Sequence, residues 1–229
     1  MGALYLVRHG QASFGQANYD QLSKIGHEHS AVLGRHLKAQ GLNIDRVVCG
    51  GMKRHAQTAD ECLGVMGYDG ERSIDTGFDE YDHQEVLTRF NPAFAEPAGL
   101  AAALARASNP RATFQKHFSD AVQRWVGGNF DEDYRESWPQ FKQRCVASAE
   151  AAAAAGGSGH NTVIFTSGGA ISVIVAHALR LDDRTAFELN WIIANTSVTR
   201  LIYGKDRLTL SYFNNFSHVE GDERLLTYR

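Results

Sequence analysis

Three short apolar runs, each closed by a turn that contains glycine, constrain the fold of this chain most strongly. They lie at residues 3–7, 47–49 and 162–166. A short apolar run bounded by glycine is typical of a strand that is buried on both faces, as in the interior of a parallel sheet. The chain therefore predicts a sheet built around these runs.

Helical patterns alternate with the apolar runs. From Ser23, apolar side chains recur at helical spacing as far as Leu37, and Gly41 follows as a stop signal. Residues 53–66 have a second helical pattern, and an apolar helix is expected at residues 170–180. Strands that alternate with helices in this way predict an α/β fold with a mostly parallel sheet.

The last third of the chain adds a helix and a hairpin. An Ala-rich stretch at residues 146–155 predicts the helix, with Gly156 after it as a stop. Residues 198–203 and 208–213 predict the two strands of a hairpin, because only a short turn separates them. Together these elements predict a three-layer sandwich, in which helices flank a mostly parallel central sheet.

The middle of the chain has a different composition. Residues 81–140 contain all four prolines, several aromatic residues and helical patterns near 100–107 and 114–125, but no strand pattern. We therefore expect a single domain over residues 1–229 with a helical insertion at about residues 81–140. This insertion is expected to form a lid over a site at the strand ends.

The composition excludes some classes of function. The 229 residues include 23 Lys and Arg against 26 Asp and Glu, so the net charge is −3 and argues against a nucleic-acid partner. No apolar run approaches the roughly 18 residues that a membrane helix needs. The spacing of the three cysteines matches no metal site. We expect a cytoplasmic protein with no membrane contact and with cysteines buried in its core.

The residues that could take part in a reaction lie at the ends of the predicted strands. His9 follows the first run next to Arg8, and Arg54 follows the second run. The carboxyl ends of parallel strands meet at one crevice, where arginines and backbone N–H groups favour an anion such as a phosphoryl group. His9 could attack such a group. The same glycine-containing turns would also be needed simply to pack helices closely against the sheet. From the residues alone, a phosphate site and a purely structural role both stay open.

Four segments then resemble the histidine phosphatase superfamily, the phosphoglycerate-mutase-like proteins. They are Leu6–Gln11, Tyr19–Gly26, Lys53–Ala59 and Thr162–Ile171. The first resembles the family's signature, the second its following segment, the third its second arginine motif and the fourth its late strand. They occur in the family's order and span most of the chain.

This resemblance implies a phosphatase that needs no metal or other cofactor. His9 would become a phosphohistidine, while Arg8 and Arg54 would bind the phosphoryl oxygens. Glu80 is expected to protonate the leaving oxygen, with Asp82 as the rival assignment. The attacking nitrogen of His9 must lack a proton, so its other nitrogen needs an acceptor, such as a carbonyl of the turn at residues 10–15.

One residue departs from the family's pattern. Ser167 stands where the family has its second catalytic histidine, before Gly168. Ser167 and the backbone N–H of Gly168 can still donate hydrogen bonds to a phosphoryl group, but they supply no charge. By analogy with oxyanion-hole variants, losing such a donor costs about 2.7–4 kcal/mol, or roughly 100- to 1000-fold in rate.

Other groups could compensate for this departure. His83 is the foremost candidate, His218 is a weaker one, and His55 is expected to face away along its helix. Ser13 and Gln16, in the loop after His9, are expected to contact the phosphoryl group.

Three functions follow from these expectations. The first is a phosphoric monoester hydrolase acting on a small phosphorylated substrate or a phosphoprotein, in a protein that could form a homodimer. The second is a degenerate member that binds phosphate with little or no catalysis. The third is a phosphoglycerate mutase, which is disfavoured because residues 81–140 do not resemble the insertion of true mutases.

Overall fold

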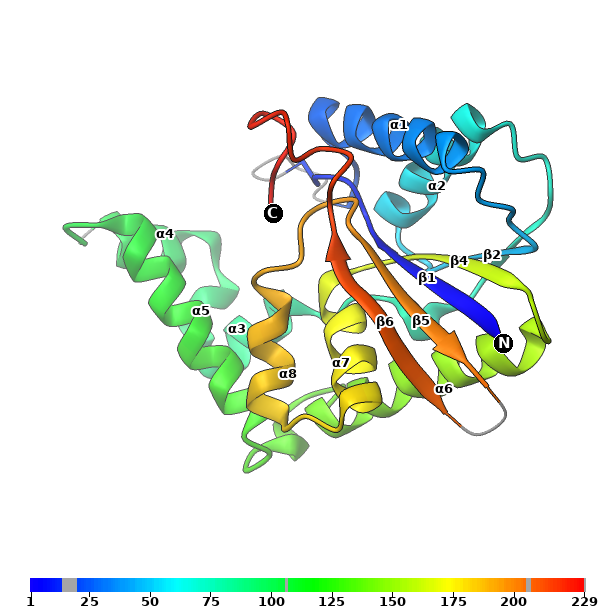
Figure 1. Ribbon diagram of the computed structural model, residues 1–229. Helices are drawn as coiled ribbons and strands as arrows, with labels where there is room; N and C mark the ends of the chain where they lie inside the picture. Colours follow the sequence, from blue (N-terminus) through cyan, green and yellow to red (C-terminus); the bar gives the residue numbers. More distant parts are fainter. Residues whose placement is uncertain (14–19, 106, 205–206, 229) are drawn as a thin grey trace. The chain divides into compact units, whose positions relative to one another are not determined.

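The computed structural model describes residues 1–13, 20–105, 107–204 and 207–228. The chain divides into two units. One is formed by Met1–Glu80 together with Arg144–Arg229, and the other by Tyr81–Gln143. The second unit spans nearly the same residues as the expected insertion. The first unit contains the whole sheet (Figure 1).

A six-stranded sheet forms the centre of the first unit, with strand order β3-β2-β4-β1-β5-β6. The strands are β1 (Gly2–Arg8), β2 (Arg46–Cys49), β3 (Arg72–Ile74), β4 (Asn161–Thr166), β5 (Val198–Tyr203) and β6 (Leu208–Asn215). The first four pair in parallel, whereas β5 pairs antiparallel with β1 and β6 antiparallel with β5. The predicted mostly parallel sheet and the antiparallel pairing at its end are therefore confirmed.

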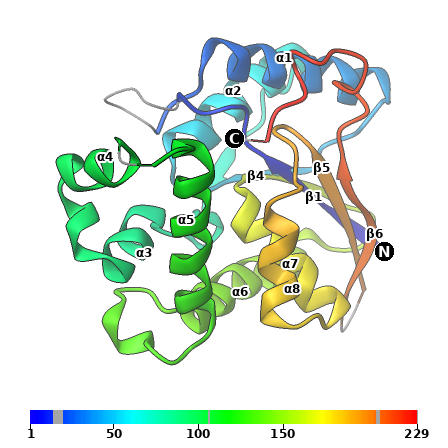
Figure 2. The same cartoon turned by 90° about the vertical axis from the view of Figure 1, so that its left-hand side faces the viewer.

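Helices cover both faces of this sheet (Figures 1 and 2). On one face lie α1 (Lys24–Ala39) and α2 (Lys53–Met66). On the other lie α7 (Gly168–Leu179), α8 (Asp183–Asn190) and the part of α6 (Trp138–Gly156) that belongs to this unit. The α/β three-layer sandwich expected from the sequence is thus present.

Burial explains why these segments fold as they do. Between the sheet and the pair α1 and α2, a core forms from side chains such as Val7, Leu33, Val47, Leu63 and Phe165. The opposite face meets α7, whose residues from its first glycine to Ala176 are all buried. A helix that is apolar on every side is expected in such a position.

The second unit is helical in its described residues. It contains α3 (His83–Phe90), α4 (Pro97–Ala105), α5 (Pro110–Val126), the 3-10 turns η2 (Pro92–Ala95) and η3 (Asp131–Asp133), and the start of α6. An aromatic cluster holds it together, in which Trp125 and Phe141 each contact Tyr81, Trp138 and one another, at ring-centroid distances from 4.9 to 5.8 Å. That this unit forms a lid stays a prediction.

Several elements differ from the expectation. The helix expected at 146–155 starts earlier, at Trp138, while α8 and the short edge strand β3 were not anticipated. All three residues of β3 are exposed, so they lack the apolar pattern by which a strand is found. Across the described residues, no helix has both the length and the hydrophobicity needed to cross a bilayer.

Candidate active site

His9 lies directly after β1, and its ring is held on both sides. Its Nδ1 lies 2.6 Å from the carbonyl oxygen of Gly10, and its Nε2 lies 3.1 Å from Nε of Arg54. A guanidinium group can only donate, so Nε2 accepts this hydrogen bond and the ring hydrogen is on Nδ1. Burial first, and then the charges of Arg54 and Arg8, hold the pKa of His9 well below its usual value. The ring is therefore neutral, with a lone pair on Nε2.

The turn after His9 requires a glycine because the chain approaches α1 there. A Cβ on Gly10 would lie 2.4 Å from the carbonyl oxygen of Gly26. The N–H of Gly10 donates to Oγ1 of Thr58, and the Thr58 hydroxyl donates to the carbonyl of Arg54. Thr58 thus connects the turn after β1 to the first turn of α2.

Arg54 comes from the first turn of α2 and is only 4% exposed. Its Nη1 lies 2.9 Å from Oδ1 of Asp20, and the other oxygen of that carboxylate accepts the backbone N–H of Lys53. Asp20 therefore fixes the guanidinium with Nε directed at His9. Sequence reasoning had placed Asp20 in a family segment but had given it no role.

Arg8 and Asn195 complete the surroundings of the first strand end. The half-buried side chain of Arg8 donates to the carbonyl oxygen of Ile193. A Cβ on Gly168 would lie 3.5 Å from Nε of Arg8, so this guanidinium lies beside the N-terminus of α7. Asn195, which sequence reasoning missed, donates from Nδ2 to the carbonyl of His9 at 3.0 Å.

Glu80, the predicted proton donor, contacts the start of α7, and its role as an acid stays a prediction. Its Oε2 accepts the backbone N–H of Gly169 at 3.1 Å, in the first turn of α7. Because His9 donates its own N–H to the carbonyl of Thr166, the end of β1 and the start of α7 are adjacent. The carboxyl group of Glu80 and the backbone of His9 are thus held at two neighbouring strand ends.

Ser167 is the N-cap residue of α7, but its side chain forms no capping hydrogen bond. Its Oγ instead lies 2.7 Å from Nε2 of His55.

The prediction that His55 faces away is wrong. The ring is fully buried, with its centroid 5.8 Å from that of His9. Burial first, and then Arg54, lower the pKa of His55 to about 3. The buried positions of α2 include His55, Ala59 and Cys62, at helical spacing, so the sequence did contain a signal for this orientation.

The other predicted residues have separate partners. The Ser13 hydroxyl donates to the carbonyl of Leu22, so its hydrogen is engaged within the loop. Gln16 lies outside the described residues. Nε2 of His218 lies 3.0 Å from Oγ1 of Thr196, whose backbone N–H donates to the carbonyl of Arg8. A compensating role for His218 stays a prediction.

Asp82 and His83 belong to the second unit. Asp82 caps α3 by accepting the N–H groups of Gln84 and Glu85, and it pairs with Arg135. His83 is exposed at the first position of α3. Their suggested roles as rival acid and as compensating group stay predictions.

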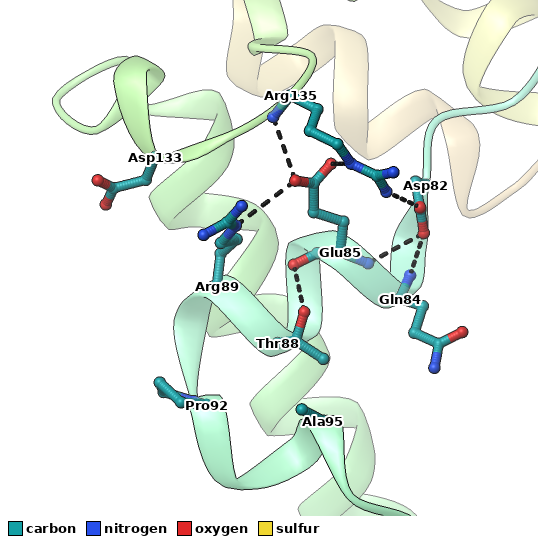
Figure 3. Close-up of a pocket in the computed structure, with 9 residues that line it drawn as sticks. All are labelled: Asp82, Gln84, Glu85, Thr88, Arg89, Pro92, Ala95, Asp133 and Arg135. Carbon is teal, nitrogen blue, oxygen red and sulfur yellow. Dashed lines mark hydrogen bonds and ion pairs between the residues drawn. The ribbon is translucent and has the colours of Figure 1, made fainter.

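The second unit also contains a cavity of about 650 Å³ (Figure 3). Most of its charged residues bind one another, because Arg135 pairs with both Asp82 and Glu85, and Arg89 pairs with Glu85. The lining contains no histidine or cysteine, so it offers no nucleophile like that of His9. Among the described residues, no group of three or more His, Cys, Asp or Glu side chains is arranged to hold a metal.

Solved structures resemble the chain over nearly its full length. A phosphoserine phosphatase variant from Entamoeba histolytica in complex with phosphoserine is 16% identical, with a TM-score of 0.67 over 96% of this chain and 100% of that one. A phosphoglycerate mutase from Bacillus anthracis is 18% identical, with a TM-score of 0.64 over 95% and 94%. A mycobacterial glucosyl-3-phosphoglycerate phosphatase in complex with VO3 is 19% identical, with a TM-score of 0.61 over 93% and 98%.

At these identities the likeness concerns the fold alone. No curated protein sequence matches the chain significantly. The family model described as histidine phosphatase superfamily (branch 1) matches residues 4–216, which include both strand ends and the helices that follow them. The chain therefore belongs to the histidine phosphatase superfamily.

Proposed function

We propose that this protein is a metal-independent phosphatase that hydrolyses a phosphomonoester or a phosphoprotein through a phosphohistidine on His9. One observation carries the proposal above all others. Nε2 of His9 is a hydrogen-bond acceptor that faces the Arg54 guanidinium, while Nδ1 is held by the carbonyl of Gly10. A neutral imidazole beside a cation can attack an anionic electrophile once the anion takes over the hydrogen bond from Arg54 and leaves the lone pair of Nε2 free.

The reaction follows in two steps. In the first, Nε2 of His9 forms a bond to phosphorus, the bond to the ester oxygen breaks, and Glu80 gives its proton to that oxygen. In the second, water attacks the phosphohistidine, Glu80 takes a proton from the water, and inorganic phosphate leaves His9 in its original state. Arg54 and Arg8 stabilise the charge on the phosphoryl oxygens in both transition states.

The position of Glu80 supports its part in this cycle. Its carboxyl group is half-buried and bonded to the N-terminus of α7, next to the end of β4. A carboxyl group that exchanges one proton with the substrate and then with water needs such a position near the leaving oxygen. Two of the similar structures are named as phosphatases, which agrees with hydrolysis.

Turnover of p-nitrophenyl phosphate in the presence of EDTA tests the proposal. The protein should release p-nitrophenol, and His9→Gln should abolish turnover because glutamine cannot form the phosphorylated intermediate. His29→Gln is the matched control, since His29 is likewise buried but lies on α1 and not at a strand end. It should retain activity.

Other outcomes would overturn the proposal. A rate that needs added Mg²⁺ would contradict the chemistry. Equal, near-zero rates in the wild type and in His9→Gln would favour a protein that only binds phosphate. Interconversion of phosphoglycerates that exceeds hydrolysis would favour a mutase.

A further inference from the structure

The hydroxyl of Ser167 is directed by a histidine from another element. A serine at an N-cap ordinarily accepts a hydrogen bond from the helix it begins. Ser167 does not, and its Oγ lies 2.7 Å from Nε2 of His55. Both side chains are fully buried, so water does not compete for this hydrogen bond.

His55 reaches this position because it starts α2 together with Arg54. The two residues follow one another, and both are buried. Arg54 contacts Nε2 of His9, while the ring of His55 lies between Ser167 and Asp79, whose Oδ1 is 3.8 Å from Nδ1. The first turn of one helix thus supplies a guanidinium group and an imidazole to the same strand ends.

We infer that His55 is a positioning residue of this site, which orients the hydroxyl of Ser167 as a hydrogen-bond donor to the phosphoryl group carried by His9. The inference rests on the proposed function. In this arrangement His55 and Ser167 together take the place that one histidine would fill after β4.

The direction of the hydrogen bond explains how this would operate. A neutral imidazole has one donor and one acceptor nitrogen. With its hydrogen on Nε2, His55 donates to Oγ of Ser167, and the hydroxyl hydrogen is left for a third atom. Nδ1 lies against the backbone of Gly50, whose hydrogen bond acts to raise the pKa of His55, and is 3.8 Å from Oδ1 of Asp79. These neighbours favour the ring hydrogen on Nδ1 while no anion is bound, and Ser167 then donates to Nε2. An anionic phosphoryl oxygen next to Ser167 would select the Nε2 tautomer, because that oxygen needs a donor.

A reciprocal exchange of the two side chains tests the inference. Ser167→His alone should lower kcat, because its ring would meet that of His55. His55→Ala alone should lower kcat on the order of 100-fold, the scale of a lost oxyanion donor. The double variant Ser167→His/His55→Ala should recover to within about tenfold of the wild type, because one imidazole then replaces the pair.

Inhibition of the enzyme by vanadate and by phosphate distinguishes a positioning role of His55 from a general structural role. In His55→Leu, the inhibition constant of vanadate, which imitates the transition state, should rise about as much as kcat falls. That of phosphate should change less than about threefold. His29→Leu, a matched change of a buried histidine on α1, should shift neither constant. Equal weakening of both inhibitors in His55→Leu would indicate general damage and overturn the inference.

The two proposals fail in different ways. If the wild type lacks turnover that depends on His9, the proposed function is wrong. If the wild type is active through His9 but His55→Ala and His55→Leu keep its kcat, only the role of His55 is wrong. A double variant no more active than the poorer single variant would also contradict that role.

Discussion

At the scale of single residues, Nε2 of His9 stays unprotonated because the ring is buried and lies near the positive charges of Arg54 and Arg8. The ring is 5% exposed, and Arg54 donates directly to the nitrogen that would attack. The guanidinium that suppresses protonation of His9 thus contacts the nitrogen that would receive the phosphoryl group in the proposed reaction. The chemistry therefore depends on Arg54 more than on any other partner of His9.

Replacing Arg54 by alanine should weaken vanadate and phosphate binding by roughly 1.5–3 kcal/mol, the scale of a hydrogen bond to a charged group. It should also raise the pKa of His9, because the largest neighbouring charge that lowers this pKa would be gone. Inhibition constants and an NMR titration of His9 measure the two effects. Arg35→Ala, an exposed position of α1, should change neither. Unaltered binding in Arg54→Ala would remove this residue from the site.

The sequence predicted His9, Arg8, Arg54 and Glu80 because each stands next to a strand end or in a motif. It did not predict the role of His55, whose function depends on which way the first turn of α2 faces. Asn195 was missed for a related reason. It precedes β5, far along the chain from His9, and only the pairing of β5 with β1 brings it close.

At the scale of elements, the site depends on how closely α1 approaches the turn after β1. Gly26 is buried in the first turn of α1, and a Cβ there would lie 2.2 Å from the carbonyl oxygen of Gln11. That carbonyl belongs to the turn that orients His9. A shift of α1 would therefore be transmitted to the attacking ring.

Gly26→Ala should destabilise the protein by about 1–3 kcal/mol through overpacking, and should lower activity with it. Gly64 in α2 is the matched control, because nothing lies within 4 Å of its Cβ position. Gly64→Ala should stabilise the protein by about 0.5–1 kcal/mol, the ordinary advantage of alanine in a helix. Denaturant unfolding measures both. A neutral Gly26→Ala would show that the contact is not restrictive.

Helices and strands could be predicted where their buried side chains form a run or a regular spacing of apolar residues in the sequence. The runs that became β1, β2 and β4 are apolar because the sheet is covered on both faces. The edge strand β3 was not predictable, since its three exposed residues are defined by pairing with β2 alone. The N-terminal extension of α6 was missed because Trp138 and Phe141 are buried in the aromatic cluster of the second unit, outside the Ala-rich pattern.

At the scale of the whole molecule, several buried histidines connect stability to pH. Burial lowers the pKa of His29 and of His218 to about 4, and of His55 to about 3. In the unfolded chain these rings would titrate near pH 6.5. Since the unfolded state binds protons first, the folded state is fully stabilised above pH 6.5 and loses stability as pH falls toward 4.

His29→Gln should flatten this dependence. Between pH 7 and pH 5, the wild type should lose about 2 kcal/mol more unfolding free energy than the variant, because one ring that resists protonation has been removed. Urea unfolding at both values measures the difference. Parallel losses in the two proteins would show that His29 is protonated as easily in the folded state as in the unfolded one.

The α/β class and the order of the layers could be predicted from the sequence, because they follow from alternating strands and helices. The division into two units could be anticipated only as a change of composition near Tyr81. The cavity of the second unit was not predictable, since its lining comes from residues 82–95 together with Asp133 and Arg135, and ion pairs between such separated residues leave no sequence pattern.

The phosphorylated intermediate tests the central claim most directly. After reaction with a labelled phosphomonoester and an alkaline quench, which preserves phosphohistidine, peptide mass spectrometry should find the phosphoryl group on His9, and none should be trapped on His9→Gln. Ser167 is the rival, because its hydroxyl contacts the ring of a histidine. A phosphoryl group on Ser167, stable to acid and still formed in His9→Gln, would contradict the mechanism.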